Sequence, residues 1–141
     1  VIISLGISMS LLLIIIKVNS EVINDYCSNS KESILEDNFD NAMLNLDNII
    51  NGYEVSDIKA ENNQIIIKYD LDFEKDYYKI RKIFFSSNKL MVSTINHDSK
   101  GISSGKNVIL NNVKEFNVYT KKSLIYFEII TELGESRIRC I

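Results

Sequence analysis

The chain has 141 residues, which is enough for one ordinary domain and too few for two large ones. Its net charge of −3 gives no overall basic field that would attract nucleic acid or an anionic membrane surface. Two cysteines are too few for a disulfide-held scaffold, and their spacing is not that of a metal site. No catalytic motif or phosphate-binding loop is present, so we expect neither an enzyme nor a bound cofactor.

The opening segment, residues 1–16, carries no charge, and a mixed-charge sequence begins at Lys17. As a helix it would extend about 24 Å, and a bilayer core needs roughly twenty residues. A signal peptide, a membrane anchor and a buried core helix all have such runs. Residues 17–21 lack a small-residue cleavage site, and the helical apolar pattern continues through them, which favours the anchor. Because the chain starts inside the apolar run, we expect further residues upstream that complete the span.

The predicted helix continues beyond Lys17 while its apolar residues thin to one stripe at helical spacing. It ends at Asn51 and Gly52, a common stop signal. Residues 1–17 are therefore predicted to span the membrane, residues 18–52 to continue as an amphipathic helix, and residues 53–141 to form a sheet domain. The stripe consists of Val18, Val22, Tyr26, Ile34, Met43, Leu46 and Ile50, with Ile23, Cys27, Leu35, Phe39 and Ile49 beside them.

From Tyr53 onward the apolar pattern changes from helical to alternating, which predicts strands joined by tight turns. Successive strands with such turns indicate one antiparallel meander, and residues 97–107 read as a polar loop. A sheet covered by one helix is a stable two-layer arrangement, so the predicted fold class is α+β, with Ile125, Phe127 and Ile129 facing the helix. The predicted strands are 53–59, 64–71, 77–85, 90–95, 113–120, 124–132 and 135–141, with a short strand or turn at 108–112.

Residues 1–7, Val-Ile-Ile-Ser-Leu-Gly-Ile, are similar to the stretch that follows the processing motif of type IV prepilins and pseudopilins. Residues 109–116, Ile-Leu-Asn-Asn-Val-Lys-Glu-Phe, resemble a block before the last strands of minor pseudopilins of the competence ComGF and type II secretion J types. Together with the long helix, these segments resemble a pilin subunit from end to end. The processing motif itself, a Gly/Phe junction followed by Phe-Thr-Leu-x-Glu, is not in the chain.

The resemblance implies cleavage upstream of Val1 by a prepilin peptidase, followed by methylation of the new N-terminus. It also implies that the helix anchors the subunit in the cytoplasmic membrane and later packs against other pilin or pseudopilin subunits in a filament. The side chains expected to contact lipid and then neighbouring helices are Val1, Ile2, Ile3, Leu5, Gly6, Ile7, Leu11, Leu12, Leu13, Ile14, Ile15 and Ile16.

The two cysteines and four of the basic residues each have a functional interpretation and a purely structural one. A disulfide between Cys27 and Cys140 is chemically permitted outside the cytoplasm, but two free, partly buried thiols are the default. Lys79 with Arg81, and Arg137 with Arg139, alternate along strands, so each pair shares a face. If both pairs met, they would form a cationic patch able to contact DNA phosphates; ordinary solvated strand faces are the default.

Weaker signals concern residues with metal-binding or catalytic chemistry. His97 beside Asp98 reads as a loop histidine, and the acidic residues between Asp70 and Asp76, Glu74 included, lack calcium-loop spacing. The sequence thus predicts a non-catalytic subunit of a type IV pilus-like filament that serves DNA uptake in competence. The alternatives are a type II secretion pseudopilin, a membrane-anchored extracytoplasmic binding module unrelated to pili, and a signal-anchored enzyme.

Overall fold

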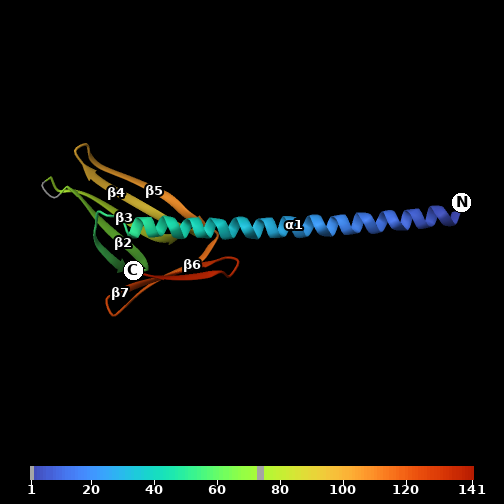
Figure 1. The fold of residues 1–141 in the computed structure, drawn as a ribbon. Helices are drawn as coiled ribbons and strands as arrows, with labels where there is room; N and C mark the ends of the chain where they lie inside the picture. The colour runs from blue at the N-terminus through green and yellow to red at the C-terminus, as the bar shows by residue number, and fades with distance from the viewer. Residues whose placement is uncertain (1, 73–74) are drawn as a thin grey trace. The chain divides into compact units, whose positions relative to one another are not determined.

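The computed structural model describes residues 2–72 and 75–141, with side chains of the first helix described from residue 6 onward. Its described residues form one long helix, α1 (Ile2–Ile50), followed by antiparallel strands (Figure 1). The predicted α+β class, with a long N-terminal helix and antiparallel sheets, is confirmed. The strands are β1 (Val55–Glu61), β2 (Gln64–Asp72), β3 (Tyr77–Ser86), β4 (Lys89–Asp98), β5 (Gly101–Asn111), β6 (Val113–Lys121), β7 (Leu124–Thr131) and β8 (Ser136–Cys140).

The chain divides into two compact units, Val1–Asp40 and Asn41–Ile141, and α1 contributes to both. The boundaries that the sequence analysis predicts, after residues 17 and 52, separate the membrane span, the amphipathic helix and the sheet domain and stay a prediction. In the second unit the last turns of α1 are covered, because Met43, Leu46 and Ile50 are each at most 5% exposed. Within that unit, β4 and β5 lie on one side of these turns and the β6–β7 hairpin lies on the other (Figure 1).

Three hairpins are closed by two-residue turns whose residues both have positive φ. These are Asn62 with Asn63, Ser87 with Asn88, and Lys122 with Ser123. Two consecutive left-handed residues match the twist of paired strands, and asparagine tolerates this conformation better than most residues. The local sequence therefore sets the registers of β1–β2, β3–β4 and β6–β7. The sequence analysis predicts the strands and the tight turns of these hairpins, but not their registers.

The strands form two sheets, with the orders β1-β2-β3-β4-β5 and β6-β7-β8, so the single predicted meander is wrong. The chain reverses at Asn112, whose φ is 58°. Directly after it, the Val113 N–H donates to the Asn88 carbonyl, and the Glu132 N–H donates to the Asn112 carbonyl. Because these backbone groups bond to other segments, β6 begins a new sheet and does not pair with β5.

The polar loop predicted at residues 97–107 is also wrong, because β4 continues to Asp98 and β5 begins at Gly101. Residues 101–108 are exposed, so neither face of this strand requires apolar side chains. Period-2 hydrophobicity signals a strand only when one face is buried. A polar strand at the edge of a sheet gives no such signal.

The core of the second unit joins both sheets to the end of α1. Ile65, Ile67 and Ile83 from the five-stranded sheet are fully buried, and so is Ile129 from the three-stranded sheet. Ile125 and Phe127 share the face of Ile129 and are buried as well. Burying each such side chain contributes roughly 1.5–3 kcal/mol before conformational entropy is subtracted.

Asn63 links the two sheets through its side-chain amide. Its Nδ2 donates to the Phe116 carbonyl at 2.5 Å, and its Oδ1 accepts from the Val118 N–H at 2.6 Å. The amide therefore pairs with β6 as a neighbouring strand would. One turn residue of the first sheet thus satisfies backbone groups of the second sheet.

Candidate functional site

The first candidate site is the exposed apolar surface of α1 in the first unit. The large apolar side chains of residues 7–16 are each between 53% and 65% exposed. Consecutive apolar residues on a helix face every direction, so no single packing partner could cover them. Such a helix is typical of an environment that is apolar all round, namely a bilayer or a bundle of helices.

Two serines of α1, one within the apolar run and one just after it, bond to the helix itself. Ser10 Oγ donates to the Gly6 carbonyl at 2.9 Å, and Ser20 Oγ donates to the Ile16 carbonyl at 2.9 Å. Side-chain bonds to the carbonyl four residues earlier leave no unsatisfied hydroxyl in an apolar medium. Ser10, which lies within the apolar run, is therefore compatible with the hydrocarbon region of a membrane.

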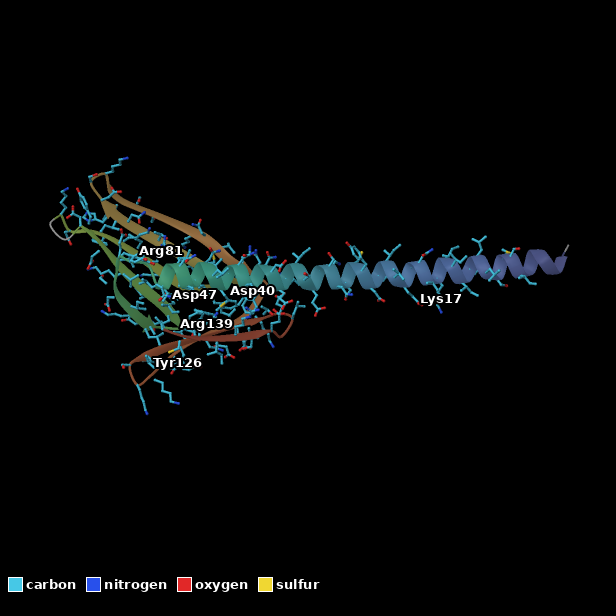
Figure 2. The ribbon with its side chains drawn as sticks, in the orientation of Figure 1. Lys17, Asp40, Asp47, Arg81, Tyr126 and Arg139 are labelled. Atoms are coloured by element: carbon cyan, nitrogen blue, oxygen red, sulfur yellow. The ribbon has the colours of Figure 1, made fainter. Side chains whose placement is uncertain are left out.

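By length and composition, α1 is the helix among the described residues that could cross a membrane. Lys17 follows the apolar run and lies exposed on α1 (Figure 2). A lysine at this place can extend its aliphatic stem along apolar surface and keep its amine in water. Of the residues predicted to contact lipid, Val1 lies outside the described residues, as do the side chains of Ile2, Ile3 and Leu5.

The predicted amphipathic stripe is covered only near its end. Val18, Val22, Ile23, Tyr26 and Ile34 are all more than half exposed, in contrast to the buried stripe residues of the second unit. A helical apolar pattern predicts a stripe but not the length of the partner that covers it. The first unit thus presents an apolar surface beyond the predicted membrane span.

The second candidate site is formed by basic residues on the inner face of the five-stranded sheet. Lys79 and Arg81 share a face of β3, as the alternation predicts, and they pair in register with Tyr69 and Ile67. The Lys79 Nζ lies 5.8 Å from the centroid of the Tyr69 ring, and the Arg81 Cζ lies 5.3 Å from it. These are the distances of cation–π contacts.

The two basic pairs, which would form a cationic patch only if they met, do not lie in one sheet. Arg137 and Arg139 lie on β8 and pair in register with Ile129 and Phe127 of β7. Arg81 and Arg139 lie on opposite sides of the last turns of α1 (Figure 2). Each pair shares a face, but the two pairs belong to different sheets.

Lys79 and Arg81 carry like charges on half-buried side chains. Burial lowers the pKa of Lys79, and the neighbouring Arg81 charge lowers it further, whereas Glu54 opposes this more weakly. Burial raises the pKa of Tyr69, although the Arg81 charge partly offsets this effect. The Tyr69 hydroxyl donates to the Ile49 carbonyl, which ties the aromatic ring that both cations contact to the end of α1.

A groove of about 290 Å³ runs beside Arg81 within the second unit. Sequence reasoning does not identify it, because its walls come from three segments far apart in the chain. The polar side chains that surround it can donate or accept hydrogen bonds. The groove is lined by Asn45, Asn48, Ile49, Arg81, Val92, Thr94, Asn107, Val108 and Ile109.

The two cysteines are free thiols, and both are exposed. The sequence analysis expects free thiols by default, but partly buried ones. Cys27 belongs to the first unit and Cys140 to the second. A hydrogen bond with the Cys140 thiol raises the pKa of the Tyr126 hydroxyl, and the Tyr126 ring stacks on Tyr119 at 5.5 Å. Sequence alternation does not reveal the stacked pair of Tyr119 and Tyr126 on the outer face of β6 and β7.

The histidine and the acidic residues show structural contacts. His97 lies in β4 instead of a loop; its Nδ1 is 3.1 Å from the Asp76 carbonyl, and its ring packs on Tyr78. Asp70 pairs with Lys68 at 3.0 Å, and this hydrogen bond lowers the pKa of the Asp70 carboxyl. Glu74 lies outside the described residues, and among those described no group of His, Cys, Asp and Glu is placed to hold a metal.

Comparisons of the chain with protein-family models, with curated proteins and with solved structures find no match.

Proposed function

We propose that this chain is a non-catalytic structural subunit of a type IV pilus-like filament, of the minor pilin or pseudopilin class. The observation that carries the proposal is the run at residues 7–16, apolar on every side and more than half exposed. This surface requires lipid before assembly and neighbouring helices afterwards. The resemblance of residues 1–7 and 109–116 to pseudopilins adds support, and the second of these favours the competence type.

The mechanism follows from the two environments open to an apolar helix. Helices in a bilayer gain little from the hydrophobic effect, so packing and small residues drive their association. Gly6 has no heavy atom within 4 Å of the position of a Cβ, which leaves its surface open to a neighbouring helix. Self-bonded serines such as Ser10 allow the same surface to face lipid or protein. Filament growth would thus exchange lipid contacts for helix contacts.

The proposed topology places the second unit outside the cytoplasm, with α1 crossing the cytoplasmic membrane once. Prepilin peptidase would process the precursor upstream of Val1, as the resemblance implies. Other pilin or pseudopilin subunits would be the partners in the filament. The exposed free thiols of Cys27 and Cys140 would then be open to oxidation outside the cytoplasm.

The test of the anchor is Leu12→Lys, because Leu12 lies within the apolar run and is 59% exposed. A lysine near the centre of a spanning helix costs about 3 kcal/mol on insertion scales. We expect the variant to lose membrane flotation and to be absent from the sheared filament fraction. The matched control is Asn24→Lys, which places the same charge beyond the run and should leave both properties intact. Incorporation of Leu12→Lys into filaments would contradict the proposal.

A second test concerns the precursor. A short basic leader that ends in glycine, followed by Phe-Thr-Leu-x-Glu directly before Val1, would support the filament subunit. Mass spectrometry of the mature chain should then find an N-methylated terminus at that junction. A precursor with an ordinary signal-peptide cleavage site would favour a membrane-anchored binding module instead.

A further inference from the structure

Four acidic residues of α1 form one stripe, which we name the acidic stripe: Glu21, Asp25, Glu32 and Glu36. At 100° per residue they fall within an arc of about 60°, and the stripe extends roughly 22 Å along the helix. All four side chains are exposed. The stripe begins one turn after Lys17, just beyond the proposed membrane span.

The charges of the chain are divided unequally between the two units. The first unit has two basic and six acidic residues, for a net charge of −4. The second has 14 basic and 13 acidic residues, for a net charge of +1. Two copies of the chain can therefore attract each other when the first unit of one meets the second unit of the other.

Lys79 and Arg81 are suited to receive carboxylates. Neither forms an ion pair with a carboxylate among the described residues. Holding two half-buried like charges side by side is unfavourable, and an anion placed between them would relieve that cost. Asn45, Asn48 and Asn107 of the adjoining groove supply amide donors that can bond to a carboxylate.

The spacing of Lys79 and Arg81 matches the spacing of neighbouring carboxylates in the acidic stripe. Residues two apart on a strand are about 6.7 Å apart, which is the separation expected for Lys79 and Arg81. Residues four apart on a helix are displaced by about 6 Å along its axis, which is the separation of Glu32 and Glu36 and of Glu21 and Asp25. Two neighbouring carboxylates of the stripe can therefore oppose both cations at once.

We propose that the acidic stripe of one copy docks on Lys79 and Arg81 of a second copy, beside the groove that contains Arg81. The inference rests on the proposed function, because it names the contact through which subunits recognise each other outside the membrane. It assigns the second unit a role in assembly that the apolar run alone does not supply. The partner is a second copy of this chain, since its charge and spacing match the cationic pair.

The contact can be tested with a carbodiimide, which joins a lysine amine to a carboxylate that touches it. Full-length ¹⁵N-labelled and unlabelled chains are reconstituted together in phosphatidylcholine vesicles, cross-linked, and digested for mass spectrometry. We expect cross-links from Lys79 to a carboxylate of the acidic stripe, with one peptide labelled and the other unlabelled. The inference would be overturned if Lys79 cross-linked only to carboxylates outside the acidic stripe. It would also be overturned if no cross-linked pair contained one labelled and one unlabelled peptide.

Charge variants sharpen this test. Arg81→Glu should lower the yield of the mixed-label cross-link roughly tenfold, and so should reversal of the stripe pair that cross-links. Combining Lys79→Glu and Arg81→Glu with the reversed stripe pair should restore a mixed-label product between the same positions. The matched controls are Lys82→Glu, on the other face of β3, and Asp37→Lys, about 100° from Glu36 around the helix; neither should change the yield. Equal losses in the controls, or no restoration, would overturn the inference.

Flotation of the same vesicles separates the two proposals. If the chain floats with the vesicles but gives no cross-link between Lys79 and the stripe, the inference fails and the membrane-anchored subunit stands. If the wild-type chain does not float, the proposed function itself fails. Raising the salt concentration should weaken the cross-link without affecting flotation, because screening acts on the charge contact and not on apolar insertion.

Discussion

The two units of this protein use the same apolar residue types in opposite environments. In the first unit Leu12 and its neighbours are more than half exposed, whereas Leu46 in the second unit is 1% exposed, although all belong to one helix. The second unit has sheets that bury the end of the helix, whereas the run of the first unit stays exposed among the described residues and, under the proposed function, would be covered by lipid or other subunits. A large exposed apolar surface therefore marks the part of the chain whose packing partner is a membrane or another molecule.

The strongest test of this difference is the same substitution made once in each unit. Leu46→Ala should destabilise the second unit by about 3 kcal/mol, because it removes buried methyl groups and leaves a cavity. Leu12→Ala should leave the free energy of unfolding unchanged. The measurement is urea unfolding of the full chain in detergent, followed by the near-ultraviolet circular dichroism of its tyrosines. Equal effects of the two substitutions would contradict the contrast between the buried end of α1 and its exposed apolar run.

A smaller effect is expected at Asn63, whose amide links the two sheets of the second unit. Asn63→Gly keeps the left-handed turn but removes both bonds to β6, which should cost about 1–2 kcal/mol. Asn62→Gly is the control, because Asn62 has the same turn conformation, with a φ of 51°. Thermal unfolding should show a lower midpoint for Asn63→Gly alone. An equal decrease in both variants would assign the effect to the turn and not to the link.

The smallest effect is expected at Lys79. Lys79→Met removes a half-buried charge beside Arg81 and should raise stability by less than about 1 kcal/mol near neutral pH in dilute detergent solution. The folded pKa of Lys79 lies below its unfolded value near 10.5, so the unfolded state binds more protons between the two values. Wild-type stability should therefore rise relative to Lys79→Met as the pH increases through that window.

Comparing wild type with Lys79→Met also serves as the control. Tyr69 titrates in both proteins, so its contribution to the free energy of unfolding cancels in their difference. The difference in the free energy of unfolding should shrink as the pH approaches 10.5. If Lys79→Met is less stable than wild type at neutral pH, the contact of Lys79 with the Tyr69 ring outweighs the cost of burying its charge.

Local sequence signals predicted much of the fold, and their failures have clear causes. Two-residue turns such as Asn62-Asn63 marked the hairpins, because few residues adopt the left-handed conformation. The first part of β5, residues 101–107, was missed, because its exposed and mostly polar residues leave no alternation to detect. The division into two sheets was also missed, because it depends on contacts such as the hydrogen bond from Val113 to Asn88, two residues that are distant in the chain.

The candidate sites were predictable to different degrees. The apolar run is visible in the sequence because it depends only on consecutive residues. The placement of Lys79 and Arg81 on one face of β3 followed from alternation along the strand. Their separation from Arg137 and Arg139 depended on which sheet each strand joined. The groove beside Arg81 could not be predicted, since Asn45 and Asn107 meet only after the end of α1 packs on the sheet.

The sequence by itself determined the long helix, the length of its apolar run and most hairpins, because these depend on neighbours a few residues apart. Only the tertiary structure decided where along α1 the burial begins, how the strands divide between sheets, and which charges share a face with the groove. Those features arise from contacts between distant segments, and a pattern along one segment does not identify its partner. The exposed stripe residue Val22 and the buried stripe residue Met43 illustrate this, since both belong to the same predicted stripe.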